Sequence, residues 1–200
     1  MLGISLSVIV GMLLGYFFKN QAVLGFSDYL MDAGLVFLLF FVGIDMGRNS
    51  GIFSKLKEFG KIIWFLPFTT VFGTFLGAGL ASNFTTLSMG EALVVSSGMG
   101  WYSLSAIEIS KVNTQLGSIA FLSNVFREFL AIFMIPFIAK RIGHFEAISA
   151  GAAPAMDTLL PVINRYTSSD TAVVSFFTGV VLSSLVPIIV PLMIRLFNIS

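Results

Sequence analysis

Two adjacent charged residues, Arg127 and Glu128, lie in the middle of the apolar segment formed by residues 116–139. A charged side chain in the hydrocarbon core of a bilayer costs about 2.5–3.5 kcal/mol on insertion scales, so it is rarely there without a partner or a task. Neighbouring residues of a helix point about 100° apart, so Arg127 and Glu128 cannot simply neutralise each other on one face. We predict that Glu128 binds a cation or carries a proton, with Asn124 one turn away as its polar companion. The alternative is an ion pair or packing contact that only holds helices together.

Two aspartates are weaker candidates for the same pathway. Asp157 lies between Pro154 and Pro161, which interrupt helices, so it could cap a helix N-terminus, act as a ligand in a broken helix, or do both. Asp45 ends an apolar stretch just before Arg48. A solvated acid at the membrane interface is the simpler interpretation of Asp45, and a buried ligand is the alternative.

A glycine-rich segment, residues 98–103, adds backbone and aromatic groups to this set. Its candidate site residues are Gly98, Gly100, Trp101, Tyr102 and Ser103. A flexible backbone leaves carbonyl oxygens free, and aromatic faces beside such oxygens suit an ammonium through cation–π attraction. The alternative is an aromatic belt at the membrane interface, where Trp and Tyr are common.

The composition identifies a membrane protein. Hydrophobic residues make up 56% of the 200 residues, charged residues only 10%, and the mean hydropathy is +0.97. The 11 basic and 10 acidic residues form no nucleic-acid footprint, and the absence of cysteine excludes disulfides and thiol chemistry. The sole histidine is distant from any serine motif, and no phosphate-binding loop is present. We therefore expect a non-enzyme without cofactor or metal.

Apolar segments long enough to cross a bilayer predict an all-α integral membrane fold. Five such spans are expected, at residues 2–18, 33–44 with flanks that extend it to 29–47, 62–81, 116–139 and 171–197. Two more apolar segments, residues 91–107 and 146–163, are broken by glycine or proline. Backbone groups left unpaired by such breaks are costly against lipid, so these segments should lie where protein or a wet cavity covers them, typically at a transport site.

The distribution of basic residues predicts the topology. Residues 48–61 carry four basic residues and residues 82–90 none, so the first loop is expected in the cytoplasm and the second outside. A second basic cluster, at Lys140, Arg141 and His144, is cytoplasmic only if residues 91–107 form a re-entrant hairpin that enters from outside. We favour that hairpin, which puts the N-terminus inside and the C-terminus outside.

An internal repeat is suggested when the chain is shifted by 55 positions. The shift aligns Glu91 with Glu146 and Pro136 with Pro191, and it superposes a broken segment followed by a long helix in each half. One hairpin plus one span is an odd number of crossings, so consecutive copies would be inverted, as in many secondary transporters. The expected units are residues 1–82, with three helices, and the repeats 83–143 and 144–200.

Three segments resemble the signature segments of bacterial lysine exporters of the LysO type. They are GMGWYSLS at residues 98–105, NVFRE at 124–128 followed by Ile135-Pro136, and GAAPAMD at 151–157; FFVGI at 40–44 is a fourth similar segment. The resemblance implies export of L-lysine, coupled to inward proton flow through an essential intramembrane acid. Glu128 occupies the matching position. It also implies a multi-pass protein of the bacterial inner membrane.

The same resemblance also implies possible partner chains. Exporters of this type begin with an additional three-helix segment, so the chain matches their C-terminal two-thirds. A small membrane subunit is expected to supply that segment, and the chain could also form a homo-oligomer. The alternatives for function are export of another amino acid or organic cation, or a non-transporting accessory subunit. In the latter, the buried charges should tolerate neutral replacement.

Overall fold

The structure is a computed structural model that describes residues 62–199, Gly60 and a few isolated helical positions nearer the N-terminus, namely Val10, Ala33, Phe37, Phe40 and Ile44. Contacts divide the chain into two units, Met1–Arg48 and Asn49–Ser200. The spans expected at residues 2–18 and 33–44, the basic loop 48–61 and Asp45 therefore lie outside the described residues, apart from those isolated positions.

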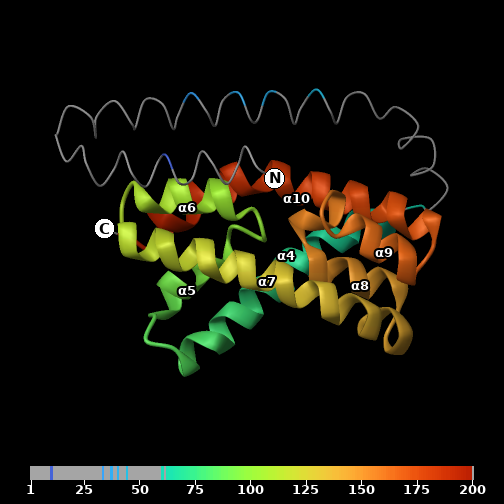
Figure 1. The fold of residues 1–200 in the computed structure, drawn as a ribbon. Helices are drawn as coiled ribbons and strands as arrows, with labels where there is room; N and C mark the ends of the chain where they lie inside the picture. Colours follow the sequence, from blue (N-terminus) through green and yellow to red (C-terminus); the bar gives the residue numbers. More distant parts are fainter. Residues whose placement is uncertain are drawn as a thin grey trace. The chain divides into compact units, whose positions relative to one another are not determined.

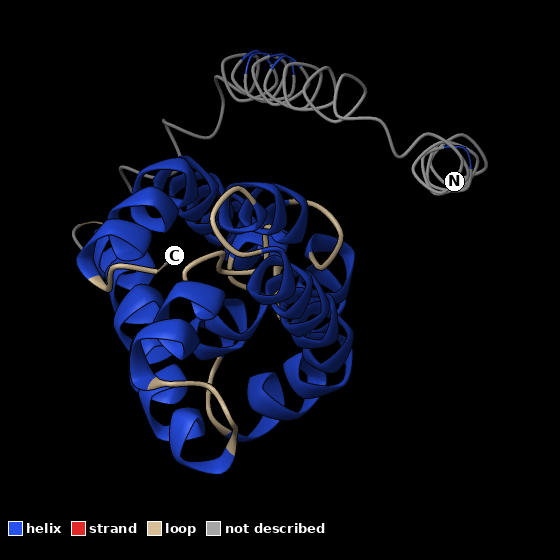
Figure 2. Ribbon diagram, turned by 90° about the vertical axis from the view of Figure 1, so that its left-hand side faces the viewer, coloured by secondary structure: helices blue, strands red, loops and turns tan. Residues whose placement is uncertain are grey.

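Helices account for all the regular structure of residues 62–199 (Figures 1 and 2). In chain order they are α4 (Ile62–Ala81), η1 (Ser82–Phe84), α5 (Met89–Ser96), α6 (Tyr102–Ser110), α7 (Thr114–Arg141), α8 (His144–Gly151), η2 (Ala153–Met156), α9 (Leu160–Tyr166) and α10 (Ser169–Leu196). Among them α4, α7 and α10 are long and apolar enough to cross a membrane, and they coincide with the three spans expected in this part of the chain. The total of five spans stays a prediction.

Side-chain caps fix where the two longest helices begin. The Asn113 side chain accepts a hydrogen bond from the backbone N–H of Leu116 at 2.9 Å at the start of α7. Ser168 does the same for Thr171 at 3.2 Å at the start of α10. Such caps satisfy amides that have no partner within the helix. Lys140 and Arg141 in the last turn of α7 complement its negative dipole end.

Both expected interruptions are present. The first separates α5 from α6 at residues 97–101, and the second separates α8 from α9 at residues 152–159, with η2 inside it. Positive φ angles occur in both, at Met99 and Gly100 in the first and at Ala152 in the second. With 8 and 9 residues, α5 and α6 are each about 12–14 Å long, so neither alone spans the roughly 30 Å hydrocarbon core.

The helix bounds repeat along the chain. α5 and α8 both have 8 residues, α7 and α10 both have 28, and the members of each pair begin 55 residues apart. Figure 1 shows α7 and α10 running in opposite directions. The offset is the one that aligns the two halves of the sequence. The inverted repeat itself, and the division at residues 82 and 143, stay predictions.

A tightly packed cluster of small and branched side chains joins α4, α7, α8, α9 and α10. Ala131 and Ile135 of α7 contribute to it, together with Ala147 and Ile148 of α8 and Val174 of α10. Large apolar side chains on α4 and α7 instead lie on the surface, for example Trp64, Phe65, Phe68, Phe72, Phe126, Phe129 and Phe133. An apolar surface of this extent suits contact with lipid.

Candidate functional site

The two chain interruptions meet each other. The backbone N–H of Ala153 donates to the carbonyl oxygen of Met99 at 3.1 Å, so the breaks are joined by a main-chain hydrogen bond. A Cβ atom at Gly100 would lie 2.5 Å from Cδ of Pro154, and Gly100 has φ +97°. Both the close approach and the backbone angle therefore require glycine at this position.

Asn124 of α7 closes the first break. Its Oδ1 accepts from the backbone N–H of Gly100 at 2.7 Å, and its Nδ2 donates to the carbonyls of Ala120 at 2.8 Å and Val95 at 3.4 Å. The side chain is 3% exposed. Asn124 therefore bonds to main-chain groups and makes no hydrogen bond to Glu128, and its place beside Glu128 in the pathway stays a prediction. An amide carries both a donor and an acceptor, and here these satisfy main-chain groups that the broken helix leaves unpaired.

The carbonyl oxygens of the first break are also engaged. Those of Gly98 and Gly100 accept from the backbone N–H groups of Trp101 and Tyr102 at 2.7 and 3.0 Å, and that of Met99 accepts from Ala153. The prediction of free carbonyls beside the aromatic rings is therefore wrong, because the break closes into hydrogen-bonded turns. Trp101 and Ser103 are half-buried. Their role in binding a cation stays a prediction.

Glu128 lies on α7 one turn after Asn124, the residue that bonds to the first break. Its carboxylate and that of Asp157 are both within electrostatic reach of the Tyr102 hydroxyl, at the start of α6. The Tyr102 ring is held edge-on to Phe121 of α7, with centroids 5.6 Å apart. Glu128 is half-buried and has no hydrogen bond or ion pair with any described residue. The fold thus places Glu128 of α7 and Asp157 of the second break where both act electrostatically on Tyr102 of α6.

Asp157 does not cap a helix. Its Oδ1 accepts from the backbone N–H of the next residue, Thr158, at 2.6 Å, and its side chain is exposed. The N-cap of α9 is Leu159, which gives no side-chain hydrogen bond, so the helix-cap interpretation is wrong. The reason is that two residues separate Asp157 from α9, and its carboxylate bonds within its own turn. The carboxylate is therefore accessible.

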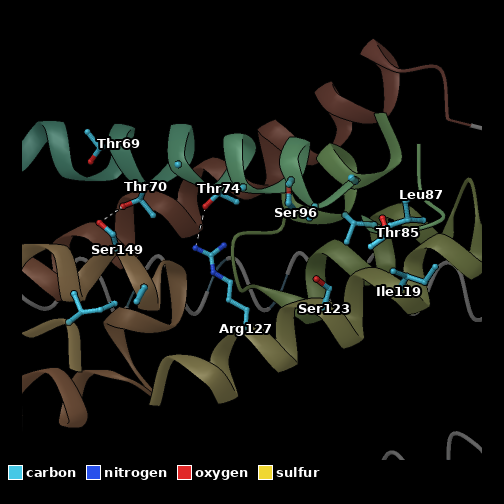
Figure 3. A pocket seen from close by; sticks show the side chains of 18 residues that line it. Thr69, Thr70, Thr74, Thr85, Leu87, Ser96, Ile119, Ser123, Arg127 and Ser149 are labelled. Carbon is cyan, nitrogen blue, oxygen red and sulfur yellow. Dashed lines mark hydrogen bonds between the residues drawn. The ribbon is translucent and has the colours of Figure 1, made fainter. Parts of the chain in front are cut away.

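Arg127 points away from Glu128, as their spacing predicts. Its Nη2 donates to Oγ1 of Thr74 on α4 at 3.2 Å (Figure 3). Arg127 lines an open cavity of about 650 Å³ between α4, α5, α7 and α8. Hydroxyl groups dominate the polar lining of this cavity, from Thr69, Thr70, Thr74, Thr85, Ser96, Ser123 and Ser149.

This cavity was missed by reasoning from the sequence. A usable signal was present on α4, where Thr70 and Thr74 lie one turn apart and Gly73 and Gly77 repeat the same spacing. The contributions of α5 and α8 could not be read in that way. Asp45 lies outside the described residues, so nothing connects it to either site.

Comparison with known proteins gives a consistent result. The family model described as lysine exporter LysO matches residues 5–194. A protein of Haemophilus influenzae named for lysine export is 31% identical over 186 residues, which cover 92% of both chains. Lysine exporter LysO of Escherichia coli is 31% identical over 184 residues, which cover 92% of this chain and 60% of that protein. No solved structure matches the chain. The chain is a membrane protein that belongs to the lysine exporter LysO family.

Proposed function

We propose that this protein exports L-lysine from the cytoplasm in exchange for protons, with Glu128 as the coupling carboxylate. Family membership supports lysine as the substrate. One observation carries the coupling: a half-buried carboxylate in the middle of the 28-residue α7 that has no partner among the described residues. An ionisable group at this depth is costly unless it serves a transport step.

Glu128 and Asp157 form the cation-binding part of the proposed site. Both carboxylates act on the same region, beside the Tyr102 hydroxyl, so together they attract the side-chain ammonium of lysine. A proton that arrives from outside neutralises Glu128 and releases lysine. Loss of that proton to the cytoplasm restores the charge, and the next lysine binds. The proton and the substrate therefore compete for one carboxylate.

The arrangement of the helices supports alternating access around this site. The two breaks contact each other, and α7 and α10 run in opposite directions, which suits two inverted repeats related across the membrane midplane. Rocking of one repeat against the other would open the site to each side in turn. The proposed topology has the hairpin of α5 and α6 entering from outside and that of α8 and α9 entering from the cytoplasm.

Lysine flux in proteoliposomes tests the coupling. The purified chain is reconstituted into liposomes that contain labelled lysine. The liposomes are then placed in a more acidic buffer, so that the proton gradient is directed inwards. We expect Glu128→Gln to abolish gradient-driven efflux. Glu108→Gln is the matched control, because Glu108 lies on α6 and its carboxylate pairs with Lys111 at 3.0 Å. Normal efflux from the Glu128→Gln protein would contradict the proposal.

The same preparation separates the alternative functions. A panel of labelled ornithine, arginine and organic cations identifies a different substrate. A non-transporting accessory subunit would give no flux for any of them, and Glu128→Gln would leave its assembly unchanged. The small membrane subunit and the homo-oligomer stay predictions. Flux measured with and without a co-expressed neighbouring gene product tests the first, and the mass of the detergent complex tests the second.

A further inference from the structure

We propose that the cavity beside Arg127 is a carboxylate-binding subsite that holds the α-carboxylate of the amino acid. The inference rests on the proposed function and adds to it a second point of recognition. Glu128 and Arg127 are adjacent on α7, but their side chains face different surroundings. The acidic side suits an ammonium and the basic side suits an anion, which are the two kinds of charge that an amino acid carries.

Several N–H groups of the Arg127 guanidinium make no hydrogen bond to a described residue. Only Nη2 makes a hydrogen bond to a described residue, the one to Thr74. Within the described part of the chain, no side-chain nitrogen or oxygen that is sealed from solvent lacks a hydrogen-bond partner. The other N–H groups of Arg127 are therefore not sealed from solvent, and Arg127 lines the cavity. A planar guanidinium with such groups binds a carboxylate through two parallel hydrogen bonds.

The cavity offers room and a further polar group next to this guanidinium. A Cβ atom built at Gly73 or Gly77 of α4 would meet nothing within 4 Å, so both glycines border open space. Ser123 lies one turn before Arg127 on α7 and also lines the cavity (Figure 3). Its hydroxyl has no hydrogen bond with a described residue, so it can donate to a bound carboxylate.

The depth of Arg127 favours a small solute over a lipid headgroup. It is the fourteenth residue of the 28-residue α7, so it lies about 20 Å along the helix from either end. Lipid phosphates lie outside the roughly 30 Å hydrocarbon core. A phosphate anchored at the interface is therefore too distant, whereas a transported amino acid passes this depth.

A comparison of substrates with and without a carboxylate tests the subsite. Efflux of lysine is measured against efflux of lysinamide and cadaverine, which keep the side-chain ammonium but lack the carboxylate. We expect wild-type protein to prefer lysine by about 10- to 100-fold, the effect of losing charge-assisted hydrogen bonds. In Arg127→Gln this preference should fall to near unity, because lysine efflux drops and lysinamide efflux does not.

Each other result has a defined meaning. Equal efflux of lysine and lysinamide by wild type would overturn the subsite while leaving lysine export intact. An equal loss of both in Arg127→Gln would assign Arg127 a structural role, through its contact with Thr74, and also overturn the subsite. Absence of lysine flux from wild type, both alone and with the co-expressed neighbouring gene product, would instead overturn the proposed function, and the inference with it.

A second variant keeps every charge in case Arg127→Gln does not fold. Gly77→Leu fills the cavity from α4 without touching Arg127, and it should lower lysine efflux more than lysinamide efflux. Leu76→Phe is the matched control, since Leu76 is an exposed neighbour on α4 that does not line this cavity. If Gly77→Leu folds and leaves the preference for lysine unchanged, the carboxylate is bound elsewhere.

Discussion

Asn124 and Arg127 lie within one turn of α7 but have different partners. Asn124 bonds to the first break, while Arg127 reaches α4. The neutral side chain of Asn124 and the charged side chain of Arg127 each suit their surroundings. The neutral amide satisfies buried main-chain groups without a desolvated ion, and the guanidinium borders a cavity lined by hydroxyl groups. At this scale, the type of each polar side chain follows from the groups that it must satisfy.

Replacement of Asn124 by alanine should destabilise the fold. It leaves the buried N–H of Gly100 without its acceptor, which costs about 1–3 kcal/mol. We expect a lower thermal midpoint in detergent for Asn124→Ala. Ser118→Ala is the control, because the Ser118 hydroxyl is exposed and bonds only to its own helix. Equal midpoints for the two variants would mean that Asn124 does not hold the break.

Gly100 should tolerate no side chain. Gly100→Ala imposes the contact with Pro154 and a strained φ, together costing about 1–3 kcal/mol. Adding Pro154→Ala removes the contacting Cδ atom and should restore only part of the thermal midpoint, because the strain in φ persists. Gly73→Ala has the opposite expectation, a small gain, since that position is helical with open space around it. Unchanged stability of Gly100→Ala would refute the close contact.

The short helix α5 depends on how it begins. Ser88 and Glu91 form a capping box, in which the backbone N–H of Ser88 donates to Oε2 of Glu91 at 2.7 Å and the N–H of Glu91 donates to Oγ of Ser88 at 3.3 Å. With 8 residues, α5 has few internal hydrogen bonds, so its end groups matter more than those of α7. It leads directly into the first break and so helps to position it.

The capping box should make the stability of the fold depend on pH. The Ser88 backbone hydrogen bond, and after it the Ser88 side chain, lower the pKa of Glu91 from its ordinary 4.5. A carboxyl with a lowered pKa stabilises the fold above its unfolded pKa, and this contribution is lost as pH falls through the folded pKa. We expect the thermal midpoint of wild type to exceed that of Glu91→Gln at pH 7 and the difference to shrink as pH falls below the ordinary pKa of 4.5 and through the lowered pKa of the folded state. A difference that does not change with pH would contradict this.

At the scale of the whole molecule, the two short hairpins decide the topology. If α5 and α6 form a re-entrant pair, both ends of that pair lie on the same side of the membrane. If α5 and α6 together cross the membrane once, the orientation of α7 is reversed and the basic cluster at its end lies outside. The positive-inside rule favours the first arrangement.

Cysteine labelling distinguishes the two arrangements without background, because the sequence contains no cysteine. Thr86→Cys and Val112→Cys are placed before α5 and after α6, and both positions are exposed. We expect both to react with an impermeant maleimide added outside intact cells. Ile142→Cys, after α7, should react only once the membrane is opened. Labelling of Thr86→Cys but not Val112→Cys from outside would show a full crossing.

The local features of this protein could be predicted from its amino-acid sequence. The spans at α4, α7 and α10 follow from uninterrupted apolar segments, and both breaks follow from Gly98, Gly100 and Pro154. These depend on properties of neighbouring residues, the cost of charge in lipid and the effect of glycine and proline on helix hydrogen bonds. The separation of Arg127 from Glu128 also required only helix geometry.

The contacts between side chains and groups distant in the chain depend on how the helices pack. Asn124 binds Gly100 across 24 positions, and Arg127 binds Thr74 across 53. A helix periodicity fixes relative directions on one helix, but the partner in each direction depends on how several helices pack. For that reason the sequence does not predict the bond from Asn124 to Gly100, the closed turns of the first break or the cavity beside Arg127, which is lined by residues of α4, α5, α7 and α8.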